Sequence, residues 1–304
     1  MISQVRTSHI AKLLGVVLLM VVLTLAGCGG GGSGSGKPNL TIGSKKDTDG
    51  QLLATMYSLL LQKNGYNVTL KLALGDTPIL FQAIQSNQVS MYPEFTGTAL
   101  SAILKLPATQ DAQAAYNTVK QQYEQKYHIT WLDPAYGLND SYGICTSQSK
   151  AQSDGLSSLN DLTAHNGQLT IATPPDGLTA AVQPVEHGYN VTFKNVVQED
   201  AELTYQSVQH GDADLNVCYT TDTSIVTDNF VVLKDTQNVF PIYNPAPIIR
   251  DDVLSQSPQI ANILKPLESK LTTDIILQLI AKVQVQHETV HQVAKDWLTS
   301  VGLL

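Results

Sequence analysis

Two stretches of this chain occur twice, separated by nearly the same number of residues, and this repeat restricts the fold more than any other feature. NGYNVTLK at 64–71 returns as HGYNVTFK at 187–194, which is an offset of 123 residues. FQAIQSN at 81–87 returns as YQSVQHG at 205–211, an offset of 124 residues. Two matches at nearly one offset indicate a duplicated structural unit. We therefore predict two lobes of related build.

Strand-like apolar runs alternate with helix-like runs through residues 39–92. In the first helix-like run apolar residues recur at helical spacing, namely Leu52, Leu53, Met56, Leu59 and Leu60. Asn64-Gly65 supplies a stop for this helix, and Asp76 or Thr77 caps the next one, with Pro78 in its first turn. The alternation predicts α/β lobes, each with a largely parallel sheet covered on both faces.

The repeat makes FTGT at 95–98 the counterpart of YTTD at 219–222 and pairs Phe95 with Tyr219. Both segments follow a helix and then a strand, so they lie at a strand's carboxyl end, where open α/β sheets place ligands. We expect each lobe to present an aromatic ring and a threonine hydroxyl group to one cleft.

The amino terminus has the pattern of a signal peptide, with Arg6 and Lys12 ahead of an apolar run at 13–25. It ends in Leu-Ala-Gly-Cys, which resembles the bacterial lipobox, so we predict a lipoprotein signal peptide at 1–27 and lipidation of Cys28. An ordinary secretory signal is the alternative. The glycine- and serine-rich stretch at 29–36 is predicted to be a flexible tether within 28–38. The folded part is then extracytoplasmic and held at the bacterial cell membrane.

The net charge argues against nucleic acid as a partner. The chain has 18 lysines and arginines against 26 aspartates and glutamates, a formal charge of −8, and no basic block. Beyond Cys28 only Cys145 and Cys218 remain, and an oxidising exterior permits a disulfide between them. Two buried free thiols are the alternative.

Five segments in order resemble the substrate-binding lipoproteins of ABC importers for quaternary-amine osmoprotectants, the glycine betaine, carnitine and choline binding family. They are IGSKKDTDGQLLATM at 42–56, MYPEFTGTAL at 91–100, LNDSYGICT at 138–146, CYTTD at 218–222 and FPIYNPAPIIR at 240–250. The resemblance implies an α/β, two-lobed periplasmic-binding-protein fold of type II-like build, with the ligand cleft between the lobes.

The same resemblance assigns the binding residues. The family's aromatic cage falls on Phe95, Tyr142, Tyr219 and Tyr243, and the threonine that holds a ligand carboxylate falls on Thr98. The chain has Phe95 where the family has tyrosine, which keeps the aromatic face. It also has Gly50 where the family's GSK segment ends in glutamine, with Gln51 one place on, and this leaves the partner of the carboxylate open.

Two neighbours of these segments, Tyr92 and Asp140, are further candidate ligand-binding residues. The cage suits a trimethylammonium group, which has no N–H to donate and is recognised by the faces of aromatic rings. If Tyr142 and Tyr219 reach one pocket from neighbouring strands, Cys145 and Cys218 come close enough to form a disulfide.

HETVH at 287–291 fits the zinc peptidase pattern H-E-x-x-H. A catalytic zinc needs a third ligand, usually from farther along the chain, and the 13 residues after His291 contain neither His nor Glu. The apolar residues from Val290 to Leu298 recur at helical spacing with Thr289 as cap, which places His287 before the helix. We predict neither an enzyme nor a bound metal.

Together these patterns predict a monomeric solute-binding protein that captures a quaternary amine of the glycine betaine, choline or carnitine type for the subunits of an ABC permease, without a cofactor. Lobe 1 is predicted at 39–138 and 246–304, and lobe 2 at 139–245. The alternatives left open are another betaine-like ligand such as ergothioneine, a secreted zinc hydrolase that uses HETVH, and a tethered sensor domain without transport.

Overall fold

The structure is a computed structural model that describes residues 37–175 and 177–304. The predicted signal peptide, Cys28 and most of the tether lie outside these residues. Within the described ranges, no helix combines the length and the apolar character that crossing a membrane requires.

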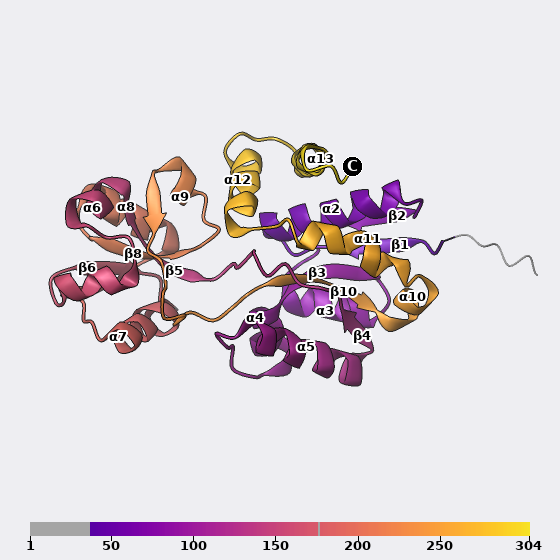
Figure 1. The fold of residues 1–304 in the computed structure, drawn as a ribbon, viewed down its shortest axis with the longest axis horizontal. Helices are drawn as coiled ribbons and strands as arrows, with labels where there is room; N and C mark the ends of the chain where they lie inside the picture. Colours follow the sequence, from indigo (N-terminus) through magenta and orange to yellow (C-terminus); the bar gives the residue numbers. More distant parts are fainter. Residues whose placement is uncertain (1–36, 176) are drawn as a thin grey trace, which may run out of the picture. The chain divides into compact units, whose positions relative to one another are not determined.

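The first lobe is built on a five-stranded sheet with the order β2-β1-β3-β10-β4 (Figure 1). β1 runs parallel to β2 and β3, whereas β10 runs antiparallel to β3 and β4. The strands are β1 (Leu40–Gly43), β2 (Val68–Lys71), β3 (Met91–Phe95), β4 (Ile129–Trp131) and β10 (Pro245–Arg250). The predicted parallel sheet is therefore confirmed except for β10, which returns from the second half of the chain.

Helices cover both faces of this sheet, as the alternating pattern predicts. α2 packs on one face with α11, α12 and α13, and α3 and α5 lie on the other (Figure 1). The helices are α2 (Thr48–Lys63), α3 (Thr77–Gln85), α4 (Thr96–Thr98), η1 (Ala99–Leu104), α5 (Ala112–Tyr127), α10 (Asp251–Gln256), α11 (Gln259–Glu268), α12 (Thr273–Gln284) and α13 (Val290–Ser300).

The ends of α2 show how the local sequence sets the boundaries. The side chain of Asp47 accepts a hydrogen bond from Gly50 N at 2.8 Å and caps the helix start. Asn64 is the carboxyl-terminal cap, and Gly65 follows with a φ of 79°, a conformation that glycine adopts without steric cost. The predicted stop at Asn64-Gly65 is confirmed.

The second lobe repeats this plan with the strand order β7-β6-β8-β5-β9. Its strands are β5 (Tyr142–Ser147), β6 (Thr170–Thr173), β7 (Asn195–Gln198), β8 (Leu215–Tyr219) and β9 (Phe230–Val232). Its helices are α6 (Gln148–Asp154), η2 (Leu159–His165), η3 (Leu178–Val182), α7 (Gln183–Tyr189), α8 (Ala201–His210) and α9 (Ser224–Thr227). Two apolar clusters form its core on either side of the sheet.

The two sheets match strand for strand, so the duplication predicted from the repeat is confirmed. β1, β2 and β3 correspond to β6, β7 and β8, and the antiparallel strand next to β3 and β8 is β10 in one lobe and β5 in the other. Phe95 and Tyr219 are the last residues of β3 and β8, as the offset of the repeat requires. The boundaries of the two lobes in the loops between the sheets stay a prediction.

Candidate functional site

Two tyrosines form a pair at the ends of two neighbouring internal strands of the second sheet. Tyr142 begins β5 and Tyr219 ends β8, and the two residues lie directly opposite each other in the antiparallel register. Their ring centroids are 4.9 Å apart with the planes tilted by 35°. The hydroxyl group of Tyr219 donates to that of Tyr142 at 3.3 Å. Both side chains are only half-buried, so their surfaces remain accessible to a ligand.

A disulfide fixes these two strands together just behind the tyrosines. Cys145 and Cys218 are bonded, with their Cα atoms 5.9 Å apart. In the register Cys218 lies opposite Gly143 and Cys145 lies opposite Asn216, so the bridge runs diagonally across β5 and β8. The disulfide expected from the neighbourhood of Tyr142 and Tyr219 is therefore confirmed.

Phe95 is at the equivalent place in the first lobe but is more deeply buried, with 5% of its surface exposed. The Nζ atom of Lys45 lies 5.2 Å from the centroid of its ring. Lys45 in turn forms an ion pair with Glu94, with Nζ 2.5 Å from Oε1. One face of Phe95 thus already has a cation near it, which is the interaction that a quaternary ammonium would make with the ring.

Tyr243 and Thr98 lie at the same end of β3 as Phe95. Tyr243 packs closely on α4, since a Cβ atom added to Gly97 would come within 2.6 Å of its ring. The backbone N–H group of Tyr243 donates to Asn139 Oδ1 at 2.8 Å, which ties it to the segment that enters the second lobe. Thr98 is the last residue of α4 and is half-buried, as is Tyr243.

Tyr92 has no exposed surface and lies in the core of the first lobe among Tyr123, Trp131 and Ala246. Its hydroxyl group donates to Glu94 Oε2 at 3.3 Å. Tyr92 is therefore linked to the site by its hydrogen bond to Glu94, the partner of Lys45, and does not present an exposed face to a ligand.

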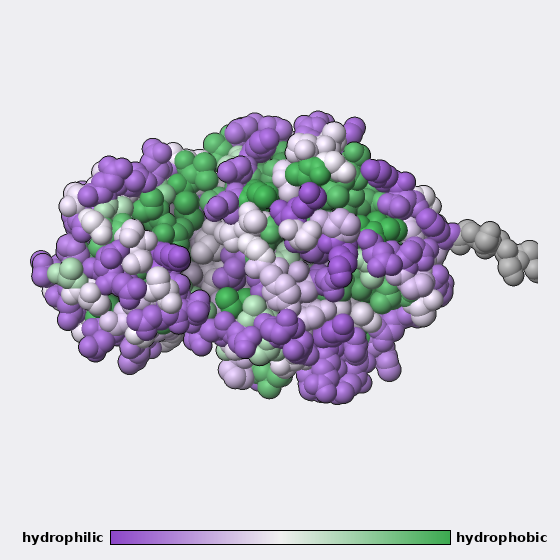
Figure 2. All heavy atoms as spheres, viewed as in Figure 1, coloured by the Kyte–Doolittle hydropathy of each residue, from purple (hydrophilic) through white to green (hydrophobic). Residues whose placement is uncertain are grey.

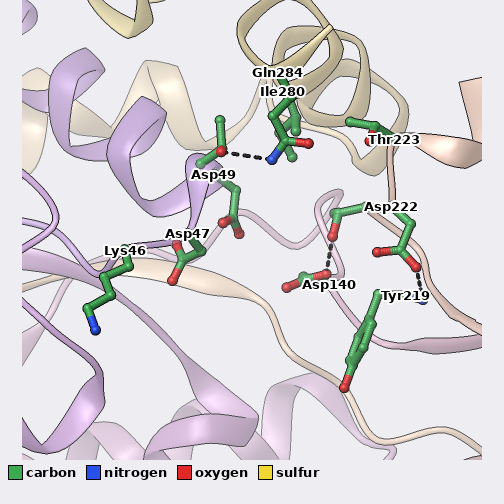
Figure 3. A pocket seen from close by; sticks show the side chains of 11 residues that line it. Lys46, Asp47, Asp49, Asp140, Tyr219, Asp222, Thr223, Ile280 and Gln284 are labelled. Carbon is green, nitrogen blue, oxygen red and sulfur yellow. Dashed lines mark hydrogen bonds between the residues drawn. The ribbon is translucent and has the colours of Figure 1, made fainter. Parts of the chain in front are cut away.

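The cavity beside Tyr219 is walled by both halves of the molecule (Figure 3). It has a volume of about 340 Å³. Its lining residues are Lys46, Asp47, Thr48, Asp49, Asp140, Tyr219, Thr221, Asp222, Thr223, Ile280 and Gln284. The sequence predicted Tyr219 and Asp140 as site residues, and both line this cavity. Figure 3 shows the side chains of Asp47, Asp49 and Asp140 gathered around one space.

Asp140 connects the two lobes at this cavity. Its carboxylate accepts a hydrogen bond from the hydroxyl group of Thr221, and its backbone N–H group donates to Tyr243 O at 3.3 Å. Burial raises its pKa to about 6, and the nearby charges of Asp47 and Asp222 act in the same direction. Asp140 also contributes to raising the pKa of the Tyr243 hydroxyl group, after burial of that group. The carboxylate thus lies in the electrostatic neighbourhood of a predicted cage residue.

Asp49 is the buried acid on this cavity, with 6% of its surface exposed. Burial raises the pKa of its carboxyl group well above the usual value, and the charges of Asp47 and Asp140 raise it further. Asp222 is held by hydrogen bonds from Tyr219 N at 2.9 Å and from the Tyr205 hydroxyl group at 2.8 Å. Burial raises the pKa of Asp222 as well.

Asp47, Asp49 and Asp222 also line this cavity, and they were not predicted from the sequence. Two of them are in the KKDTDG segment and the third follows Tyr219-Thr220-Thr221, so the only available signal was the unusual density of acids in segments already assigned to the site. Gly50 has a local explanation, because a Cβ atom there would lie 2.3 Å from Asp47 Oδ1. A side chain at position 50 is incompatible with the present capping geometry of Asp47.

The HETVH segment lacks the helical geometry of the peptidase pattern. α13 starts at Val290, and Thr289 caps it by accepting a hydrogen bond from Gln292 N at 3.2 Å. His287 lies before this helix with a φ of 58°, so it is not one helical turn from His291 as the peptidase pattern requires. Across residues 37–175 and 177–304, no three His, Cys, Asp or Glu side chains are arranged to hold a metal ion.

The structure thus brings Tyr142 and Tyr219 together on one lobe, and it places Phe95, Thr98 and Tyr243 at the matching end of the first sheet. Whether these rings surround one ligand stays a prediction.

The sequence and the fold are similar to those of known proteins. Residues 38–300 match the profile of the family described as the substrate binding domain of ABC-type glycine betaine transport systems. A glycine-betaine-binding protein of Pseudomonas aeruginosa is 30% identical over 280 residues, which are 87% of this chain and 88% of that protein. An ergothioneine transport permease and binding protein of Helicobacter pylori is 28% identical over 87% of this chain, which spans 48% of its length. The structure of ligand-free YehZ from Escherichia coli superposes with a TM-score of 0.78 at 29% identity, covering 88% of this chain and 99% of that one.

Proposed function

The chain belongs to the family of substrate-binding domains of ABC-type glycine betaine transport systems, and we propose that it captures a quaternary amine between its two lobes for import. The observation that carries this proposal is the tilted pair of Tyr142 and Tyr219, in which Tyr219 lines a cavity walled by both lobes. Phe95 and Tyr243 at the matching end of the first sheet would supply the remaining rings, and Thr98 a hydroxyl group.

The chemistry of these side chains fits such a ligand. A trimethylammonium group is permanently charged and offers no N–H donor, so aromatic faces recognise it better than hydrogen-bond acceptors do. Each ring of a desolvated cage contributes about 0.5–2 kcal/mol, and four rings suffice for an affinity of about 1 μM after the ordering costs of binding. A ligand that bridges the lobes would stabilise their closed arrangement, which the permease then recognises.

Substrate-binding proteins of ABC importers work outside the cytoplasm, with a small ligand and permease subunits as partners. For this chain we further propose anchoring through lipidated Cys28, a monomeric state and no catalytic activity. The signal-like sequence at 1–28 supports the lipid anchor, and the acidic net charge argues against nucleic acid as a partner.

Calorimetry with glycine betaine, choline, carnitine, proline betaine and ergothioneine tests the proposal. We expect binding of at least one trimethylated amine, and we expect Tyr142→Ala and Tyr219→Ala each to weaken it by at least about 1 kcal/mol, roughly fivefold. Tyr136→Ala, which removes an exposed tyrosine outside the site, is the matched control and should leave affinity unchanged.

Unchanged affinity in both site variants would refute the cage assignment. Binding of ergothioneine alone from this panel would instead favour the alternative ligand, which the name of the Helicobacter pylori relative brings into consideration.

A further inference from the structure

Two segments of the chain join the two sheets, and a hydrogen bond ties them to each other. The first segment lies between β4 and β5 at 132–141, and the second lies between β9 and β10 at 233–244 (Figure 1). The hydroxyl group of Ser141 on the first segment donates to Pro241 O on the second at 2.6 Å. Any rotation of one sheet against the other bends these two segments, so the bonds around them control how the lobes can move.

Asn139 on the first segment is bonded to three parts of the molecule at once. Its Oδ1 atom accepts a hydrogen bond from Tyr243 N on the second segment at 2.8 Å. Its carbonyl oxygen accepts from the hydroxyl group of Thr220, which directly follows β8, at 2.7 Å. The hydroxyl group of Thr273, the first residue of α12, donates to the same carbonyl oxygen at 3.2 Å and accepts from Asn139 N at 2.9 Å. We call these four residues the hinge joint.

Thr220 attaches the second sheet to the first segment through further bonds. Its hydroxyl oxygen accepts from Ser141 N at 3.1 Å, and its backbone N–H group donates to Ser141 O at 2.9 Å. With the bond to Asn139, Thr220 therefore holds three backbone groups of the first segment. Thr220 directly follows Tyr219 in the chain, so these bonds fix the backbone that carries the ring of Tyr219.

The hinge joint reaches both halves of the predicted cage without lining the cavity beside Tyr219. The lining of that cavity contains neither Asn139 nor Thr220. Asn139 is one hydrogen bond away from Tyr243, and Thr220 is one peptide bond away from Tyr219. An effect of this joint on a ligand in that cavity therefore has to pass through the two tyrosines.

We propose that Asn139 is a positioning residue that fixes Tyr243 at the first sheet relative to Tyr219 at the second, with Thr220 as its partner. This proposal rests on the proposed function, because both rings are to contact the ammonium group. A ring attracts a cation that lies within about 6 Å of its centroid, so a small rotation at the joint is enough to remove one ring from the cage. Bonds that fix the rings before the ligand arrives also lower the ordering cost of binding.

A double-mutant cycle separates this positioning role from a purely structural one. The probe is tetramethylammonium, measured by calorimetry, because this cation offers the rings its methylated nitrogen and carries no other group. We expect Asn139→Ala to weaken its binding at least about fivefold. In a Tyr243→Ala background the same change should weaken binding no more than about twofold, because Asn139 acts through Tyr243. A loss of equal size in both backgrounds would overturn the positioning role.

The partner residue is tested by removing and restoring one hydroxyl group. Thr220→Val keeps the shape of the side chain and loses its hydrogen bonds, so it should weaken tetramethylammonium binding at least about fivefold, whereas Thr220→Ser should stay within about twofold of the unaltered protein. Thr146→Val is the matched control. Thr146 is fully buried in β5, and its hydroxyl group donates to Asp214 O at 2.7 Å, away from the joint. Equal weakening by Thr220→Val and Thr146→Val would contradict the proposal.

Amide hydrogen exchange in the ligand-free protein tests the hinge joint without any ligand. Since Asn139 Oδ1 accepts from Tyr243 N, Asn139→Ala should speed exchange of the Tyr243 N–H group at least about tenfold, and Thr146→Val should not. Unchanged exchange in Asn139→Ala would overturn the joint itself. Failure of tetramethylammonium to bind the unaltered protein would instead overturn the proposed function, and with it the role of the joint in binding.

Discussion

Replacing Glu94 by glutamine is expected to destabilise the protein substantially although the side chain keeps its size. Glu94 has no exposed surface and accepts three hydrogen bonds. Lys45 Nζ and Phe95 N donate to Oε1 at 2.5 Å and 2.8 Å, and the Tyr92 hydroxyl group donates to Oε2 at 3.3 Å. Glutamine keeps one oxygen acceptor but removes the negative charge. It also replaces the other carboxylate oxygen, which accepts a hydrogen bond, with an NH₂ group that donates.

The magnitude follows from the charge left behind. Removing one partner of a buried ion pair costs about 3–5 kcal/mol, because the other charge stays buried without compensation. Burial acts to lower the pKa of Lys45, but the charge of Glu94 and the hydrogen bond to it outweigh burial and raise that pKa overall. Since the amide oxygen still accepts from Lys45, we expect a loss near the lower end, about 3 kcal/mol.

Urea unfolding of the ligand-free protein measures this loss. The second variant, Lys45→Met/Glu94→Gln, removes both charges and should recover at least about 1 kcal/mol of the loss. Asp252→Asn serves as control, because it breaks the exposed Arg250–Asp252 pair, with the Asp252 side chain 60% exposed, and should cost less than about 1 kcal/mol. A loss below about 1 kcal/mol for Glu94→Gln, or a double variant no more stable than the single one, would refute the reasoning.

Two further predictions concern the second lobe and the cavity. Cys145→Ala/Cys218→Ala removes a bridge that spans 73 residues, and we expect it to cost about 2–4 kcal/mol in urea unfolding; a loss within error of zero would contradict a stabilising bridge. The second prediction concerns Asp140, whose pKa of about 6 is above the usual value of 3.8. This group therefore stabilises the ligand-free fold at low pH, and the contribution is lost as pH rises from about 4 to about 6. A bound cation favours the ionised form and offsets the repulsion from Asp47 and Asp222, so quaternary amine affinity should rise between pH 5 and pH 7, and Asp140→Asn should flatten this rise in calorimetry. A flat profile in the unaltered protein would contradict the position of Asp140 beside the ligand.

The binding interpretation depends on the second lobe more than on the first. Tyr142 and Tyr219 are held in register by their strands and by the disulfide behind them, so their spacing does not depend on a ligand. Hydrophilic residues dominate the rim of the face drawn in Figure 2, with apolar patches between them.

Local patterns in the sequence were enough to predict much of the fold. The end of α2 at Asn64-Gly65 and the cap of α13 at Thr289 depend on residues within a few positions of the helix end, so both could be predicted correctly. The repeat predicted the two matching sheets and the equivalence of Phe95 with Tyr219, because duplicated sequence repeats its order of strands.

The contacts at the site depend on tertiary packing, because the side chains involved are far apart in the sequence. Lys45 and Glu94 are 49 positions apart, and Asp140 meets the acids of α2 across an even longer stretch of chain. The burial of Tyr92 likewise depends on Tyr123 and Trp131, which belong to other elements. A periodic pattern records which face of an element is apolar, whereas the distance between charges on different elements depends on how those elements pack. Local sequence patterns therefore predict two α/β lobes with aromatic residues at their strand ends, whereas packing decides that Tyr219 lines one cavity with Asp47, Asp49 and Asp140.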